Sequence, residues 1–260
     1  MATDYLVSYA NGTGGHFLMS VIGHTVLDNV PSSQPWMLKQ VNKPLKAGQF
    51  NDAHMSGQFR NFVQIEIKNP KGGDIDIEEE FYNIHRLTPG RPVFLPTHFY
   101  WPEKQFKKWP NAKIAVITHT DDDLLDIAIN SFYKTEMSED WQKNQKQSNY
   151  NGLWFNSNNV MFDNLRTTPL QELSPKDLKI AVKCRISIII TAGYHFIEQE
   201  DDPRITYIPY RDLVSSVDAV ADMITRTTGK TPPGHVIEEI KGYQQRQSDF
   251  IAKTKSELDL

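Results

Sequence analysis

The sequence predicts an α/β protein of three layers, in which a central parallel sheet is flanked by helices. Two observations lead to this prediction. Short β-branched and aromatic runs alternate along the chain with segments whose apolar residues recur at helical spacing. Strands separated by helices are joined by crossover connections, which make the strands parallel. No internal repeat or domain boundary is visible, so we expect residues 1–260 to form a single domain.

The bulk composition is that of a soluble protein, with 39% hydrophobic and 23% charged residues. A net charge of −4 disfavours general binding to nucleic acid or anionic membranes, which normally requires a basic face. The apolar run around 188–190 is far too short to cross a bilayer. The first residues lack the basic start and apolar core of a secretory signal, and a lone cysteine, Cys184, suits a reducing interior. We therefore expect a cytoplasmic protein.

The first unit of the chain is a strand over Asp4–Tyr9, a glycine turn over Ala10–Gly15 and a helix from Gly15 to Leu27. In that helix Phe17 and Val21 belong to an apolar stripe with helical spacing. Turn residues at 28–35 end the helix, and a polar region follows to about residue 60.

The rest of the chain repeats the alternation of strands and helices. Strands are predicted over 62–67, 92–96, 113–118 and 204–210. Helices are predicted over 75–87, 121–134, from Ser174 as N-cap with Pro175 in the first turn, over 212–228 and within the C-terminal segment 235–260. Residues 136–168, rich in Asn, Gln and Ser with scattered aromatics, are expected to form an irregular excursion or lid.

Ligands of parallel α/β sheets gather at the loops that leave the carboxyl ends of the strands. The turn Ala10–Gly15 is such a loop, and glycines there would let backbone N–H groups approach a phosphate at the start of a helix. The turn lacks the GxxxxGK[ST] spacing of a P-loop, so a phosphate cradle and a plain strand–helix turn both remain open.

Two other loops carry groups that could act chemically. His98 in LPTHFY follows a predicted strand, where a neutral imidazole could accept a proton from an alcohol, although a lone histidine after a strand is more often structural. The three aspartates of THTDDD (118–123) are adjacent on a predicted helix and point in different directions, so capping and solvation explain them better than a metal. No HExxH or GxSxG motif is present, which disfavours a zinc site and a serine hydrolase.

Together these segments resemble the sulfotransferases with a P-loop fold that use 3′-phosphoadenosine 5′-phosphosulfate (PAPS). YANGTGGHFL (9–18) stands where that family has a PKSGTTWL-type loop for the phosphosulfate, and LPTHFY stands where the family has KTH. The stretch 106–134 follows the family's strand and RNPxDxxxS segment, and RITYIPYRDLVSSVDAVADMITRTTGK (204–230) follows its strand, YEDL, helix and LG turn. The resemblance covers about 1–30, 90–135 and 200–245.

The resemblance implies transfer of a sulfuryl group from PAPS, as co-substrate, to an acceptor hydroxyl of a glycan or small molecule, with no metal. It implies that His98 is the general base. The donor would be bound by residues of the turn and of the strand near 118, namely Asn11, Gly12, Thr13, Gly14, Gly15, His16, Phe17 and Thr118. Neither nucleic acid nor a membrane is expected as a partner, and self-association into a homo-oligomer is left open.

The sequence also departs from the family pattern. The loop lysine has no counterpart, the lysine before the Thr-His pair is Pro96, and the arginine and serine that hold the 3′-phosphate align with Thr118 and Asp126. The alternative is therefore a sulfotransferase fold that has lost its donor site and serves as a binding or structural subunit. A magnesium-dependent kinase using Asp121–Asp123 is a third, weaker hypothesis.

Overall fold

The structure is a computed structural model that describes residues 3–10, 12–27, 54, 92, 94–97, 100–133, 173–191 and 199–260. It divides the chain into two compact units. The first unit comprises Met1–Tyr9, Gly14–Thr118 and Glu198–Gln244, and the second comprises Ala10–Thr13, His119–Ile197 and Gln245–Leu260. The strand predicted at 62–67, the helix at 75–87 and the excursion at 136–168 lie outside the described residues.

The first unit holds a parallel sheet of four strands in the order β2-β1-β3-β4. The strands are β1 (Asp4–Ser8), β2 (Phe94–Thr97), β3 (Ala112–Thr118) and β4 (Ile205–Pro209). In register, Tyr5 of β1 lies opposite Phe94 on one side and Lys113 on the other. These strands confirm the predicted α/β class with parallel pairing, and each boundary lies within two residues of its prediction.

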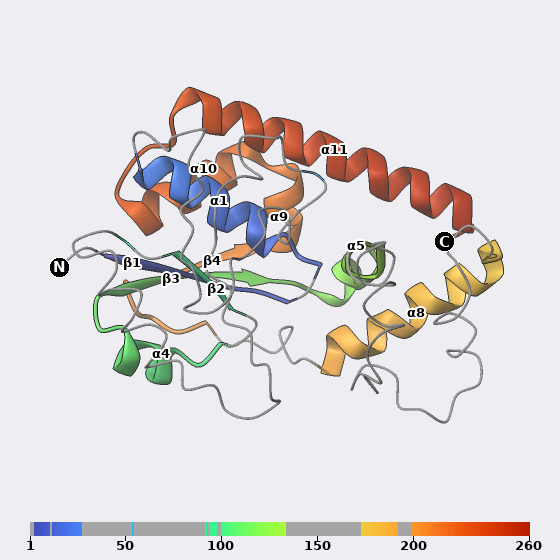
Figure 1. Ribbon diagram of the computed structural model, residues 1–260, viewed down its shortest axis with the longest axis horizontal. Helices are drawn as coiled ribbons and strands as arrows, with labels where there is room; N and C mark the ends of the chain where they lie inside the picture. The colour runs from blue at the N-terminus through green and yellow to red at the C-terminus, as the bar shows by residue number, and fades with distance from the viewer. Residues whose placement is uncertain are drawn as a thin grey trace, which may run out of the picture. The chain divides into compact units, whose positions relative to one another are not determined.

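Helices cover both faces of this sheet (Figure 1). The helices α1 (Gly15–Val26), α9 (Tyr210–Ser215) and α10 (Val217–Thr228) lie on one face, and α4 (Pro102–Lys108) lies on the other. On the α4 side, Gln105 donates a hydrogen bond to the hydroxyl of Ser8 at 3.4 Å. Because β1 is an interior strand covered on both faces, all five of its residues are buried.

The strand order fixes where the sheet can present a ligand site. From β1 the chain passes to β2 on one side, whereas from β3 it passes to β4 on the other side. The topological switch point is therefore at the carboxyl ends of β1 and β3, where open α/β sheets bind their ligands. The glycine turn leaves the sheet at the first of these ends, and the THTDDD segment leaves at the second.

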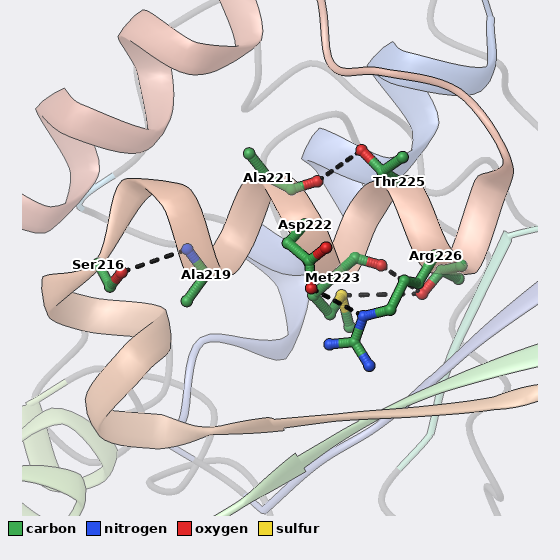
Figure 2. Close-up of polar contacts among 8 residues, drawn as sticks. Ser216, Ala219, Ala221, Asp222, Met223, Thr225 and Arg226 are labelled. Atoms are coloured by element: carbon green, nitrogen blue, oxygen red, sulfur yellow. Dashed lines mark hydrogen bonds and ion pairs between the residues drawn. The ribbon is translucent and has the colours of Figure 1, made fainter.

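The helix predicted over 212–228 is in fact two helices, and the prediction of one continuous helix was wrong. Ser216 has extended backbone angles between α9 and α10. Its hydroxyl accepts a hydrogen bond from the N–H of Ala219 at 3.2 Å, so Ser216 caps the second helix (Figure 2). Farther along α10, Arg226 pairs with Asp222 at 2.8 Å, and the helix ends as predicted before Gly229, which has a φ of 74°.

The second unit contains helices that pack on one another. These are α5 (Leu124–Ser131), which follows a single 3₁₀ turn η1 (Asp121–Asp123), α8 (Pro175–Thr191) and the second part of α11 (Gly234–Leu258). Ser174 accepts a hydrogen bond from the N–H of Asp177 at 3.2 Å, which confirms it as the N-cap of α8. The ring of Phe250 on α11 meets that of Tyr133 edge to face, with centroids 5.6 Å apart. Of the helices that the structure describes, none has the length and apolar character needed to cross a bilayer.

Candidate functional site

The turn after β1 is closed by two hydrogen bonds to one carbonyl oxygen. The backbone N–H of Thr13 donates to the oxygen of Ala10 at 3.2 Å, and the Thr13 hydroxyl donates to the same oxygen at 2.7 Å. Thr13 is completely buried, and its hydroxyl proton is used inside the turn. The side chain of Thr13 therefore stabilises the turn, and its hydroxyl oxygen can still accept a hydrogen bond but has no second proton to donate.

At Gly12 the turn packs tightly against α5, and both belong to the second unit. The φ of Gly12 is 92°, in the left-handed region that favours glycine. A β-carbon at this position would lie 2.5 Å from the carbonyl oxygen of Ile127 and 2.9 Å from the backbone nitrogen and the β-carbon of Ser131. Both the backbone angle and the close approach of α5 therefore require glycine at this position.

A buried arginine is joined to the same part of α5. Arg185, on α8, is 3% exposed, and its Nε donates a hydrogen bond to the hydroxyl of Ser131 at 2.8 Å. The backbone nitrogen and β-carbon of Ser131 thus border the position that a Gly12 β-carbon would take, while the Ser131 hydroxyl accepts a hydrogen bond from Arg185. The guanidinium group is permanently charged, so a fixed positive charge is buried within the second unit.

Sequence reasoning did not find Arg185, although a signal for it was present. The residues of α8 that are buried include Ala181, Val182 and Ile189, and their helical spacing puts Arg185 on the same stripe. A charged residue within an apolar stripe is either bonded inside the protein or part of a site. Without the packing of α8 on α5, the sequence does not distinguish this arginine from one on an exposed helix face.

The residues that continue the turn into α1 belong to the first unit, and they are packed by aromatic rings. Gly14, the N-cap of α1, has a φ of 87°, and a β-carbon there would lie 2.7 Å from the hydroxyl oxygen of Tyr243. A β-carbon at Gly15 would overlap the ring of Tyr9. Close packing against these rings therefore requires glycine at both positions.

The two candidate residues that follow these glycines have different surroundings. His16 is half-buried, and its ring lies edge-on to that of Tyr9 with centroids 5.6 Å apart. Phe17 is completely buried and stacks on the ring of Tyr243, with centroids 3.6 Å apart and planes 2° from parallel. The side chain of Phe17 is thus part of the core, so a contact from this residue to a ligand would involve its backbone.

Thr118, the candidate for the 3′-phosphate, is the last residue of β3 and is partly exposed. In the segment that follows, the N–H and the hydroxyl of Thr120 donate to Oδ2 of Asp123 at 2.9 and 3.0 Å. The interpretation of the aspartates as capping residues is therefore confirmed for Asp123, while Asp121 and Asp122 are exposed to solvent. Within the described residues no group of three or more His, Cys, Asp and Glu side chains lies close enough together to hold a metal ion.

Asp126, which stands where the family has a phosphate-binding serine, is paired with a lysine of α11. Its Oδ1 lies 2.6 Å from Nζ of Lys255 in the second unit. Both side chains are about one-third exposed, so water screens the pair in part. The lysine offsets the carboxylate charge, and with it part of the repulsion that this aspartate would exert on a phosphate.

His98 and Asn11 lie outside the described residues, so the structure does not place the predicted base or the first residue of the turn. The next residue in the sequence that the structure describes after His98 is Tyr100. Its hydroxyl is hydrogen-bonded to that of Tyr207, which also accepts from the N–H of Glu200 at 2.9 Å. Burial, followed by the bond to Tyr207, raises the pKa of Tyr100, so this phenol stays protonated.

The fold and the turn define an α/β protein whose central parallel strand leads through a glycine turn into a helix at the switch point of the sheet. Comparison of the chain with protein-family models, with curated proteins and with solved structures found no match in any of the three.

Proposed function

We propose that the protein is an enzyme of the sulfotransferase type, which transfers a sulfuryl group from PAPS to an acceptor hydroxyl. The observation that carries this proposal is the glycine turn that follows the interior strand β1 at the switch point. A site at this position receives backbone N–H groups and the positive end of a helix, which together favour an anionic group. The resemblance of four segments to the PAPS-dependent family supplies the chemistry of the ligand.

In this proposal His98 removes the proton from the acceptor hydroxyl as the acceptor oxygen attacks the sulfur of PAPS. The bond between that sulfur and the bridging oxygen of the 5′-phosphate breaks, which leaves a sulfated acceptor and 3′,5′-diphosphoadenosine. The backbone of the turn from Asn11 to Phe17 holds the phosphosulfate, and Thr118 contacts the 3′-phosphate. Negative charge develops on the departing phosphate, so preorganised donors and cations beside it lower the barrier.

Isothermal titration with 3′,5′-diphosphoadenosine tests donor binding without knowledge of the acceptor. We expect a dissociation constant in the micromolar range, and weaker binding of adenosine 5′-monophosphate, which lacks the 3′-phosphate. Absence of heat with 3′,5′-diphosphoadenosine at protein concentrations that would detect micromolar binding contradicts the proposal.

The catalytic assignment is tested by the substitution His98→Ala, with sulfate transfer from labelled PAPS to a panel of alcohols and sugars as the readout. We expect this variant to lose transfer while it still binds 3′,5′-diphosphoadenosine, because the base acts on the acceptor and not on the donor. His235→Ala removes an exposed histidine and is the matched control. Full activity of the His98 variant would exclude His98 as the base.

A second candidate function is that of a binding or structural subunit that no longer uses the donor. The packing of the turn favours it, because Gly12 faces α5 and Gly14 and Gly15 face aromatic rings at the positions where a β-carbon would be. The same titration separates the two functions, since a subunit without a donor site gives no heat with the nucleotide.

A further inference from the structure

Two tyrosine side chains of the first unit form a hydrogen-bonded pair. The hydroxyl of Tyr100, which precedes α4, bonds to that of Tyr207 on β4, and the Tyr207 oxygen also accepts from the N–H of Glu200 at 2.9 Å. The two rings lie edge to face, with centroids 6.3 Å apart. Both side chains are partly exposed, so the pair is accessible from solvent.

The pair has one more proton than its own hydrogen bonds use. Two phenols carry two O–H protons, and one of these lies in the bond between the two oxygens. The bond from Glu200 brings its own proton and occupies an acceptor position on Tyr207. Whichever phenol donates within the pair, the proton of the other remains. Within the described part of the chain no further acceptor bonds to either hydroxyl, so this proton is available to a ligand.

The pair lies at the level of the sheet where the interior strand β1 ends. Tyr207 is in register with Val116 of β3, and Val116 is in register with Ser8, the last residue of β1. The Ser8 hydroxyl accepts a hydrogen bond from Gln105 of α4, so this row of residues is on the face that α4 covers. Open α/β sheets bind their ligands near the carboxyl ends of the strands, and the pair is therefore well placed to meet one.

The charges around the pair favour a neutral ligand. Burial, followed by the bond within the pair and then by the carboxylates of Glu200 and Asp202, raises the pKa of Tyr100, so this phenol keeps its proton. Asp202 is paired with Arg204 at 2.6 Å, and Glu200 is exposed. An anionic ligand would meet the negative charge of these carboxylates, whereas the oxygen of an alcohol accepts the phenol proton without that repulsion.

The residue after Tyr100 adds an apolar surface. Trp101 is 58% exposed, more than any other large apolar side chain among the described residues. Its backbone N–H donates to the side chain of Gln105 at 3.3 Å, and Nζ of Lys104 lies 4.3 Å from the centroid of its ring. The ring is thus held against α4 while much of it faces solvent. The carbon face of a polyol such as a sugar packs well on a ring of this kind, while its hydroxyls need polar partners nearby.

We propose that Tyr100 and Tyr207 form a binding site for a neutral polyol, in which the proton not used within the pair is donated to a hydroxyl oxygen of the ligand and Trp101 packs on the ligand's carbon face. This inference rests on the proposed function in that the polyol is the acceptor of the sulfuryl group. The predicted base His98 precedes Tyr100 by two residues, and a chain of that length spans at most about 7 Å. The tyrosines therefore select the acceptor and take no part in binding the donor.

Saturation-transfer NMR on the full chain measures the binding of two neutral probes, methyl glucoside and lactose, at constant ionic strength. For the wild type we expect millimolar dissociation constants and weaker binding of glucuronate, which has a carboxylate on the same ring. The double variant Tyr100→Phe/Tyr207→Phe should bind both sugars about 3- to 10-fold more weakly, the loss of one hydrogen bond. It should bind 3′,5′-diphosphoadenosine as the wild type does. Tyr133→Phe changes a partly exposed tyrosine of the second unit and is the matched control.

The double variant is chosen because removal of both hydroxyls leaves neither phenol without its partner, so the fold should be kept. Thermal unfolding without ligand checks this, and Tyr207→Phe and Trp101→Ala are measured beside it. Each of these two variants should weaken sugar binding by itself, so the proposal is also tested if the double variant fails to fold.

Folded tyrosine variants that bind the sugars as the wild type does overturn the assignment, and tighter binding of glucuronate than of methyl glucoside overturns the ligand class. A wild type that binds 3′,5′-diphosphoadenosine but no sugar overturns this inference and leaves the proposed function in place. If the sugars bind through the tyrosines but the nucleotide does not bind, the polyol site stands and the proposed function fails. A wild type that binds neither overturns both.

Discussion

The hydroxyl of Tyr243 lies 2.7 Å from the position that a β-carbon would take at Gly14. Tyr243 is 1% exposed and stacks on Phe17, so it has little room to move away. The N-cap of α1 is thus shaped by a side chain that is distant in the sequence. A substitution at Gly14 has to overcome both a backbone conformation and a packed ring.

Gly14→Ala should therefore destabilise the protein more than the same substitution at Gly229. Both glycines have positive φ, but a β-carbon at Gly229 would meet no atom within 4 Å. We expect Gly229→Ala to cost about 1 kcal/mol in free energy of unfolding, and Gly14→Ala to cost about 2 kcal/mol more because of overpacking. Urea denaturation of both variants gives the comparison.

Removal of the Tyr243 hydroxyl checks the cause of that difference. Tyr243→Phe in the Gly14→Ala background should recover part of the lost free energy, measured as the coupling in a double-mutant cycle. Equal costs at Gly14 and Gly229, or a coupling of zero, would show that the tyrosine does not constrain this position.

Asp126→Ser should strengthen binding of 3′,5′-diphosphoadenosine. The substitution removes a carboxylate and introduces the serine that the sulfotransferase pattern has at the matching place. Removal of a partly screened like-charge repulsion worth about 1 kcal/mol corresponds to an affinity gain of about fivefold. Loss of the ion pair with Lys255 should cost at most about 1 kcal/mol of stability.

Titration calorimetry of Asp126→Ser and of Asp201→Ser gives the comparison, because Asp201 is an exposed carboxylate outside α5. If both variants, or neither, bind the nucleotide more tightly than the wild type, Asp126 exerts no specific repulsion on a bound phosphate.

His24 should make the protein less stable as the pH falls below neutrality. Burial, and then the neighbouring His235, lower the pKa of His24 from 6.5 to about 4. The rings of the two histidines lie edge to face, with centroids 6.2 Å apart. Between pH 6.5 and pH 4 the unfolded chain takes up a proton at His24 that the folded protein does not, so protonation favours unfolding.

The contribution of His24 to the free energy of unfolding should be fully present above pH 6.5. It should decline by roughly 3 kcal/mol as the pH falls to 4. Urea denaturation of the wild type and of His24→Gln across this range isolates the contribution of His24, because the other titratable groups are the same in both proteins. The variant should show a shallower loss of stability. Parallel pH profiles for the two proteins would show that His24 is not the group responsible.

Gln247→Met should stabilise the protein. Gln247, on α11, is 2% exposed, and neither atom of its amide has a hydrogen-bond partner among the residues that the structure describes. A buried polar group without a partner costs about 1–3 kcal/mol, and methionine has a similar length without that cost. Gln245→Met is the control, because Gln245 is exposed and donates to Asp249. A melting temperature that falls for Gln247→Met would show that the amide is satisfied in solution.

The elements of the fold could be predicted from local patterns in the sequence. The strand Asp4–Ser8 and the helix Gly15–Val26 follow from a β-branched run and a helical stripe joined by glycines. The break at Ser216 was missed because apolar spacing continues across it, while the serine that caps α10 also fits an exposed position in a longer helix. Capping was recognised where a proline marked the helix start, as at Ser174 and Pro175.

The surroundings of the turn could not be predicted in the same way. Which residues meet Gly12 and Gly14 depends on the packing of α5 and α11, which come much later in the chain. The burial of Arg185 and its bond to Ser131 depend on the pairing of α8 with α5, and apolar periodicity indicates a buried face without indicating its partner. Local sequence thus predicts the turn, whereas tertiary contacts decide what it can bind.

The parallel sheet also has a consequence for the order in which the protein can fold. Every strand pair joins segments far apart in the chain, since Tyr5 pairs with Phe94 and Ile114 pairs with Ile205. Non-local pairing of this kind requires the closure of long loops before any contact is gained, and it slows folding. During synthesis β1 emerges long before either of its neighbours, so its apolar residues are exposed until β2 and β3 have been made. Exposed apolar strands of this kind favour aggregation until the sheet has formed.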